Sequence, residues 1–197
     1  STVLAVWLSS MMAYAFARFD FPGKEWFFRA LLLGLMIPSM MLIIPQFVLT
    51  KQLHLIDNLW ALVLFYVSGN LALNTFLLRS FFEGIPRELD EAMEVDGANV
   101  WTRYWRLAMP LARPALATTV IFTFLATWDE FAWALTVIST ETKRTLPIAI
   151  QLFHGQNSTQ WGLVFAASLI AILPVIVVYL IFQRHFVAGL TAGAVKG

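Results

Sequence analysis

Two acidic residues near the end of a long apolar stretch are the first candidates for chemistry in this 197-residue chain. Asp129 and Glu130 lie late in the stretch that begins near Pro114, with Trp128 and Trp133 close by. A buried acid near the middle of a bilayer is unfavourable by about 2.5–3.5 kcal/mol, so such groups normally face a cavity or a partner. Carboxylates accept hydrogen bonds from hydroxyl groups, and aromatic faces suit sugar rings. Two interpretations are therefore open. In one, these residues line a path for a sugar; in the other, the tryptophans belong to an interfacial belt and the acids lie in headgroup water.

Two amides form a second polar pair inside an apolar stretch. Asn70 and Asn74 are four residues apart, so they share one face of a helix. They hydrogen-bond a substrate in a translocation path, or they hydrogen-bond across helices as polar residues in membrane bundles often do. The sequence leaves both interpretations open.

Few residues support any other kind of chemistry. The chain has no cysteine, and His54, His154 and His185 are scattered without the spacing of metal ligands. A Gly-x4-Gly-Lys-Ser/Thr phosphate loop does not occur, so we expect no cofactor on this chain and ATP only on another subunit. The net charge of +1 favours no nucleic-acid partner. Clustered groups of the kind an integral membrane enzyme needs are not seen.

The composition is that of a membrane protein. Hydrophobic residues make up 59% of the chain and charged residues only 13%, against about 25% in soluble domains. A spanning helix needs about 20 mostly apolar residues, because lipid offers backbone groups no other partner. We therefore predict an all-α, polytopic bundle. Its five spans are Ser1–Ala17, Trp26–Leu49, Leu59–Phe82, Pro114–Leu135 and Trp161–Phe182.

The basic residues are divided unequally between the two sets of connections. Ten of the 13 lysines and arginines fall on one side, and only Lys51, Lys143 and Arg144 on the other. Because positive charge favours the cytoplasmic side, the first set is expected inside the cell. Gln151–Gln160 then lies outside, as a contact for an extracytoplasmic protein or as a solvated connector. The prolines in the spans, Pro38, Pro45 and Pro174, predict kinks that are static or serve as hinges.

The segment 83–113 is too polar to span and too long for a minimal connection. Residues 87–95 favour a helix after Pro86, with Leu89, Ala92 and Met93 forming one apolar stripe. Gly97 permits a turn, and a second helical stretch follows until Pro110 and Pro114. We predict a helix, a tight turn and a second helix at the cytoplasmic surface. A soluble partner could hold this element, or it is an ordinary amphipathic connector on the membrane.

The residues of this segment resemble the EAA loop of binding-protein-dependent ABC importer permeases. The family pattern is Glu-Ala-Ala, three residues, Gly, nine residues, Ile, any residue, Leu-Pro. The matching positions here are Glu91, Ala92, Met93, Gly97, Leu107, Met109 and Pro110, with Asp96 before the glycine. Met93, Leu107 and Met109 depart from the pattern by apolar replacements. The resemblance implies that the first short helix couples the membrane domain to a cytoplasmic ATPase.

Further segments resemble the carbohydrate branch of the same family, and in particular its MalG-like permeases. They are Ala13–Arg18 with Phe21–Gly23, Asn74–Arg79, Trp128–Phe131 and the tail Phe186–Gly197. Asp129 stands where the family usually has Asn, which affects the local substrate chemistry. That branch usually has six spans in this subunit, so the resemblance implies that its first span is missing from these residues. The chain is then a single permease domain over residues 1–197, of the type I importer kind.

The resemblance implies a transport subunit without catalysis of its own, in the bacterial inner membrane. Its expected partners are two ATP-binding subunits that hold ATP and Mg, a second homologous permease, an extracytoplasmic sugar-binding protein and membrane lipid. The expected function is inward movement of a sugar by alternating access. The alternatives are a permease for a non-sugar solute and an ATP-independent secondary transporter, which predicts an internal repeat that the sequence does not show.

Overall fold

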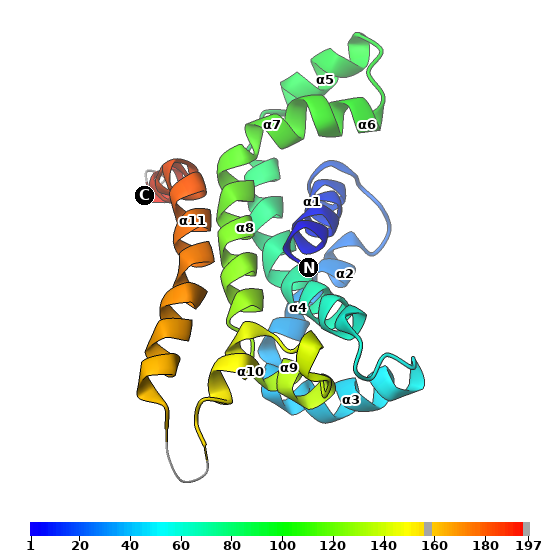
Figure 1. Cartoon of the computed structure of the whole chain (residues 1–197). Coiled ribbons are helices and arrows are strands. Elements are labelled where there is room, and N and C mark those ends of the chain that lie inside the picture. The colour runs from blue at the N-terminus through cyan, green and yellow to red at the C-terminus, as the bar shows by residue number, and fades with distance from the viewer. Residues whose placement is uncertain (156–158, 195–197) are drawn as a thin grey trace.

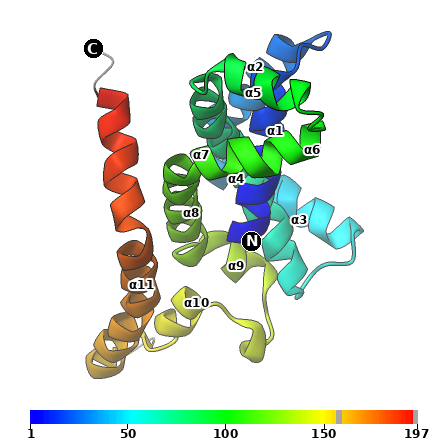
Figure 2. The ribbon, with the colours of Figure 1, turned by 90° about the horizontal axis from the view of Figure 1, so that it is seen from above.

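Four helices form the body of the molecule, and the rest of the chain gathers at its two ends (Figure 1). The computed structural model describes residues 1–155 and 159–194, with side chains up to Gln183. Helix α1 packs along α4, and α8 contacts α1, α4 and α11. Helix α11 lies at one side of the body, next to α8 (Figure 2). The body helices are α1 (Thr2–Arg18), α4 (Leu59–Glu83), α8 (Arg113–Trp128) and α11 (Trp161–Ala194).

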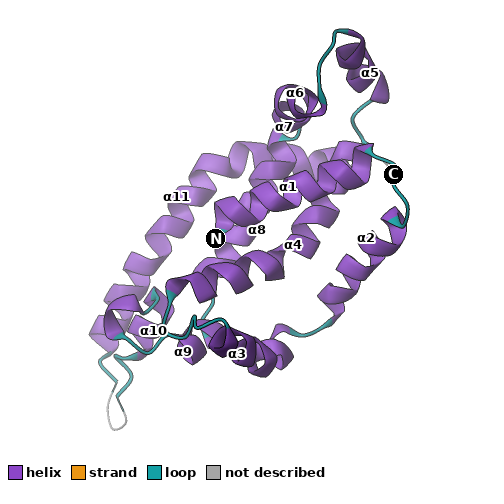
Figure 3. Cartoon of the chain, turned by 90° about the vertical axis from the view of Figure 1, so that its right-hand side faces the viewer, coloured by secondary structure: helices purple, strands orange, loops and turns teal. Residues whose placement is uncertain are grey.

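Short elements cover the two ends of this body (Figures 1 and 3). One end carries the connection between α4 and α8, and the opposite end carries α3, α9 and α10. Helix α2 lies beside the bundle and leads to α3. The elements between α4 and α8 are α5 (Arg87–Val95), α6 (Val100–Arg103), the π-helical segment η3 (Tyr104–Ala108) and α7 (Met109–Leu111). The others are α2 (Lys24–Leu33), η1 (Gly34–Met36), η2 (Ser39–Leu42), α3 (Ile43–Gln52), α9 (Ala132–Val137), η4 (Glu141–Lys143) and α10 (Leu146–Gln151).

The all-α prediction is confirmed for the described residues, and the structure shows which of the predicted spans are straight and which are bent. In the described part of the chain, two helices are long and apolar enough to cross a membrane, namely α4 and the Trp161–Gln183 part of α11. Two further candidates are bent pairs, which raise the number to four if each pair is one span. Helix α1 is apolar but has 17 residues, fewer than the roughly 20 that a straight span needs.

The second predicted span is not one helix. Its two parts, Lys24–Met36 and Ser39–Gln52, meet at 94°. Ile37 has extended backbone angles, as expected before a proline, and Pro38 itself lies outside both helical parts. Pro45 causes no break because it lies in the first turn of α3, where its missing N–H has no helical partner to lose. Pro38 therefore ends the first part of this segment.

The fourth predicted span ends earlier than Leu135. Helix α8 stops at Trp128, and a separate helix, α9, begins at Ala132. Glu130 stabilises the new start, because its carboxylate accepts hydrogen bonds from the amides of Trp133 and Ala134 at 2.7 and 3.0 Å. These are amides at the start of α9 that would otherwise lack a partner.

Two hydrophobic clusters hold the ends to the body. One joins α1, the end of α4 and η3 through Tyr14, Leu78, Phe82, Tyr104 and Ala108. The other joins the start of α4 to α9 and α10, and includes Ala61, Leu62, Trp133, Val137 and Ile148. Burial of these side chains fixes each end element to the spanning helices. By contrast, α11 leaves large apolar side chains such as Leu169 and Ile170 exposed, as expected of a helix that faces lipid or another subunit.

Candidate functional site

The connection between α4 and α8 forms the predicted helix, turn and helix. Helix α5 has the predicted bounds, Arg87–Val95. Gly97 follows with a φ of +81°, a conformation that residues with a side chain rarely adopt, so the predicted turn is confirmed. The amides of Gly97 and Ala98 donate to the carbonyl oxygens of Glu94 and Met93 at 2.9 Å each, which closes the turn. The side chain of Asn99 then caps α6 by accepting from the amide of Thr102 at 2.9 Å.

Helix α5 points its apolar residues away from the bundle. Leu89 is 43% exposed and Val95 is 88% exposed, whereas Asp90 is the one buried residue of this helix. Its carboxylate forms an ion pair with Arg18, at 2.9 Å between Nε and Oδ2. In the apolar stripe predicted from Leu89, Ala92 and Met93, the first two residues are exposed and Met93 is half-buried, so most of the stripe can meet another molecule.

The second half of the connection is anchored by Tyr104. This side chain is 2% exposed, and its hydroxyl shares a buried 2.6 Å hydrogen bond with that of Ser10 in α1. The helical stretch continues through Pro110 to Leu111, so it ends between the two prolines that were expected to end it, and Pro114 lies in the first turn of α8. The turn before Pro110 is widened, with the amide of Met109 donating to the carbonyl oxygen of Tyr104. The pair Val100–Leu111 and Arg113–Trp128 is bent by 78°, so this helix crosses the end of the body.

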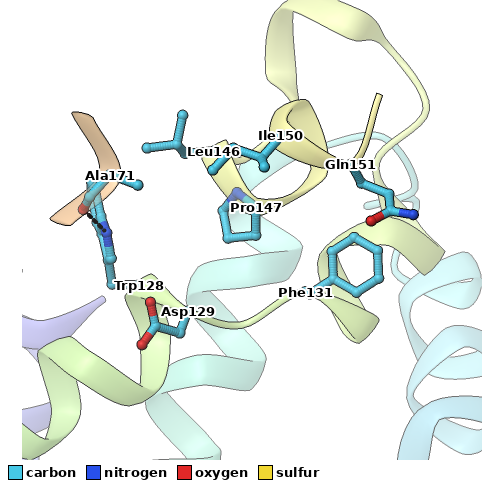
Figure 4. A pocket seen from close by; sticks show the side chains of 8 residues that line it. All are labelled: Trp128, Asp129, Phe131, Leu146, Pro147, Ile150, Gln151 and Ala171. Atoms are coloured by element: carbon cyan, nitrogen blue, oxygen red, sulfur yellow. Dashed lines mark hydrogen bonds between the residues drawn. The ribbon is translucent and has the colours of Figure 1, made fainter. Parts of the chain in front are cut away.

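A hollow of about 350 Å³ opens at the other end of the molecule, between α8, α10 and α11 (Figure 4). Trp128 lines it from the end of α8, Asp129 and Phe131 from the segment between α8 and α9, and Pro147 and Gln151 from α10. The indole N–H of Trp128 donates to the carbonyl oxygen of Ala171 in α11 at 3.1 Å. The exposed carboxylate of Asp129 faces the space that these residues surround (Figure 4). This arrangement combines an aromatic wall with hydrogen-bonding groups.

The two acidic residues have different environments. Both carboxylate oxygens of Glu130 accept hydrogen bonds. One bond comes from the hydroxyl of Tyr66 at 2.7 Å, and two come from amides of α9. Asp129 does not share these contacts and lines the hollow. Trp133 is 4% exposed and packs on Phe65, so it belongs neither to the hollow nor to an exposed interfacial belt.

The two amides also differ. Asn74 is buried, and its amide donates to the hydroxyl of Thr123 in α8 at 2.8 Å. Asn70 donates to the carbonyl oxygen of Tyr66 in its own helix, also at 2.8 Å. In this conformation Asn74 joins two helices and Asn70 remains partly exposed.

A third cluster at the hollow's end of the molecule was not predicted from the sequence. Asp57 accepts hydrogen bonds from the amides of Ser139 and Thr140, at 3.0 and 2.8 Å, and pairs with Lys143 at 2.9 Å. The hydroxyl and amide of Thr140, together with Lys143, hold the pKa of this carboxyl well below its usual range. The φ of Asp57 is +57°, and no local sequence pattern signals this conformation. Of the outer segment Gln151–Gln160, residues 156–158, including Asn157 and Ser158, lie outside the described part, as do Val195–Gly197 of the tail.

The described residues thus form a helical bundle with a polar helix–turn–helix connection at one end. The chain belongs to the family described as "Binding-protein-dependent transport system inner membrane component", whose model matches residues 5–192. It is therefore a transport permease component. No metal-binding group of His, Cys, Asp and Glu occurs among the described residues.

Three relatives illustrate the range of similarity, and each is aligned over 100% of this chain. "Trehalose transport system permease protein SugB" of Mycobacterium tuberculosis (strain CDC 1551 / Oshkosh) is 40% identical, and the chain covers 73% of its length. "Trehalose/maltose transport system permease protein MalG" of Thermococcus litoralis is 37% identical, with 71% of its length covered. "Arabinooligosaccharides transport system permease protein AraQ" of Bacillus subtilis (strain 168) is 34% identical, with 69% covered.

Proposed function

We propose that this chain is the permease subunit of an ATP-driven sugar importer in a bacterial cytoplasmic membrane. In this proposal residues 1–197 form one transmembrane domain, and segment 83–113 is its cytoplasmic coupling loop. The partners are two ATPase subunits that bind ATP and Mg, a second permease and an extracytoplasmic sugar-binding protein. The names of the three relatives, which specify trehalose, maltose or arabinooligosaccharides, support a sugar as the substrate class.

The observation that carries this proposal is the outward-facing apolar side of α5. A helix whose ion pair points inward and whose apolar residues point outward can dock into a groove on a soluble subunit. Glu91, Ala92, Met93, Asp96 and Gly97 form its docking and turn residues, and Leu107 and Pro110 continue the loop toward α8. Closure of the ATPase pair would displace α5 and shift the bundle between inward-facing and outward-facing states, since each ligand acts through its differential affinity for the two states.

The hollow near Trp128 is proposed as part of the sugar path, with Asp129 as a hydrogen-bond acceptor. Glu130 supports this path indirectly, because it fixes the start of α9 next to the hollow. Asn74 and Asn70 line the same path only if the α4–α8 contact opens, since the amide of Asn74 is now bonded to Thr123.

The experiment reconstitutes the chain in vesicles with its second permease, ATPase and binding protein. Thermal shifts of the binding protein with trehalose, maltose and arabinotriose select the sugar, and uptake and ATP hydrolysis are then measured together. We expect Gly97→Pro and Glu91→Lys to lower the amount of sugar moved per ATP while the complex remains intact. Glu141→Lys, the same charge change at the opposite end, is the control. Normal uptake in both loop variants would contradict the coupling role.

A further inference from the structure

Arg18, the last residue of α1, contacts the coupling loop at two points. Its Nη2 donates to the carbonyl oxygen of Ile85 at 2.8 Å, and its Nε lies 2.9 Å from Oδ2 of Asp90. The first contact holds the connection between α4 and α5, and the second holds α5 itself. A cation at this position is also favoured by the carbonyl groups at the C-terminal end of α1.

The Arg18–Asp90 pair is shielded from water, unlike the other ion pair of α5. The side chains of Arg18 and Asp90 are 7% and 13% exposed. Glu94 pairs with Arg103 at 2.5 Å, but the Glu94 side chain is 66% exposed. Removing one partner of a shielded ion pair lowers stability much more than removing one partner of an exposed pair, because the remaining charge is buried without compensation. The two pairs therefore differ in strength although both connect α5 to a neighbouring element.

Little apolar packing reinforces the attachment of α5. Asp90 is its only buried residue, and a hollow of about 260 Å³ lies between α5 and the end of α1. Arg18, Asp90, Tyr14 and Arg103 are among the residues that line this hollow. The ion pair thus bridges a space that side chains do not fill, and it joins α5 directly to α1.

The end of α1 is itself connected to the rest of the bundle. Tyr14, one turn before Arg18, makes edge contacts with the rings of Phe82 in α4 and Tyr104 in η3. Helix α1 also packs along α4 and contacts α8. A displacement that reaches Arg18 is therefore passed to three elements at once.

We propose that Arg18 is the positioning residue that fastens the coupling helix α5 to α1, through its ion pair with Asp90, so that movement of α5 moves the bundle. This inference rests on the proposed coupling function. Without the pair, α5 would be held only by the chain on either side of it and by the exposed Glu94–Arg103 pair, and its displacement would be absorbed by the loop.

The test uses the complete reconstituted transporter and the ratio of sugar moved to ATP hydrolysed. The probe is radiolabelled trehalose, or maltose or arabinotriose if the binding protein selects one of these. Arg18→Gln and Asp90→Asn are expected to lower this ratio about fivefold or more, with co-purification of the ATPase unchanged. Glu94→Gln, which breaks the exposed pair of the same helix, is the matched control and is expected to leave the ratio unchanged.

A second variant separates loss of the link from loss of folding. The chain has no cysteine, so Arg18→Cys with Asp90→Cys places a unique thiol pair beside the hollow. The reduced double variant should be uncoupled, and a short bis-methanethiosulfonate reagent that joins the two thiols should restore the ratio. A structural role alone would not give such recovery in the same protein molecules.

The outcomes distinguish the two proposals. If Gly97→Pro and Glu91→Lys uncouple transport while the Arg18 and Asp90 variants do not, the fastening role is wrong and the coupling loop stands. If none of these variants changes the ratio, the coupling function fails and the fastening role fails with it. If the double variant remains uncoupled after crosslinking, or loses its ATPase subunits in both states, the fastening role is also overturned.

Discussion

The adjacent acidic residues Asp129 and Glu130 have different surroundings in this molecule. Glu130 accepts three hydrogen bonds that hold Tyr66 and the start of α9. Asp129 lines a hollow with Trp128 and Phe131. In the sequence alone, both acids are candidates for the same site. The sequence gives their spacing, but it does not give the direction in which the chain turns after Trp128. The structure shows that Glu130 holds neighbouring groups of the fold, whereas Asp129 lines the hollow.

Glu130→Ala is expected to destabilise the protein, and Asp129→Ala is not. Removal of the Glu130 carboxylate leaves amides of α9 without a partner, at a cost of about 1–3 kcal/mol. Asp129→Ala should change stability by less than about 0.5 kcal/mol. The midpoint of thermal unfolding in detergent measures both effects. Equal midpoints for the two variants would contradict the separation of roles.

Asp129 also gives a prediction about sugar uptake. If Asp129 accepts a hydrogen bond from the sugar, Asp129→Ala should raise the KM for uptake by roughly fivefold, which corresponds to about 1 kcal/mol for a lost hydrogen bond. Asp129→Asn keeps an acceptor oxygen and should recover most of the uptake. Initial rates of uptake at several sugar concentrations measure this. An unchanged KM in the alanine variant would remove Asp129 from the path.

Asp57 gives a prediction about pH. The pKa of its carboxyl is lower in the folded protein than in the unfolded chain, where it is about 3.9. Its hydrogen bonds therefore stabilise the fold fully above about pH 3.9, and this stabilisation is lost as the pH falls through the pKa of the folded state. The amides of Ser139 and Thr140 should therefore stay protected from hydrogen exchange down to pH 4. Asp57→Ala should expose them at every pH. Loss of protection in the natural protein between pH 6 and pH 5 would contradict this account.

At the scale of elements, the turn at Gly97 depends on backbone conformation alone. No atom lies within 4 Å of the position that a Cβ would occupy there, so the cost of a side chain comes only from the positive φ. We expect Gly97→Ala to lower the free energy of opening this turn by about 1–2 kcal/mol. Gly97→Asn should have a smaller effect, because asparagine tolerates this conformation.

Hydrogen exchange of the amides of residue 97 and Ala98 measures this opening directly, since both donate hydrogen bonds within the turn. The alanine variant should exchange faster than the asparagine variant. The opposite order would show that the turn does not depend on the positive φ.

Local patterns predicted some elements well, and tertiary contacts explain where prediction failed. The helix Arg87–Val95 and the turn at Gly97 follow from a proline, a run of helix-forming residues and a glycine, all within one segment. By contrast, the inward orientation of Asp90 depends on Arg18, which is 72 positions earlier in the chain. The break at Pro38 was expected only as a kink, because hydropathy does not report a change of direction. The cluster at Asp57 depends on a loop 82 positions away, at Ser139.

At the scale of the whole molecule, the division of charge seen in the sequence appears in the structure. Arg18 and Arg103 pair with residues of α5, and Arg79 pairs with Glu25 near that end. Lys143 pairs with Asp57 at the opposite end. Because positive charge tends to remain on the cytoplasmic side of a membrane, this division supports an orientation with the α5 end inside the cell.

Labelling from outside intact cells tests this orientation. The chain contains no cysteine, so a single introduced thiol has no background from this chain. Glu141→Cys places the thiol in η4, at the same end of the molecule as Asp57. Val95→Cys places it at the end of α5, where the side chain of Val95 is 88% exposed. A membrane-impermeant maleimide should label Glu141→Cys in intact cells and Val95→Cys only after permeabilisation, because the α5 end carries most of the positive charge. The reverse pattern would place α5 outside the cell. It could then not be reached by an ATPase in the cytoplasm, and the coupling proposal would fail with the orientation.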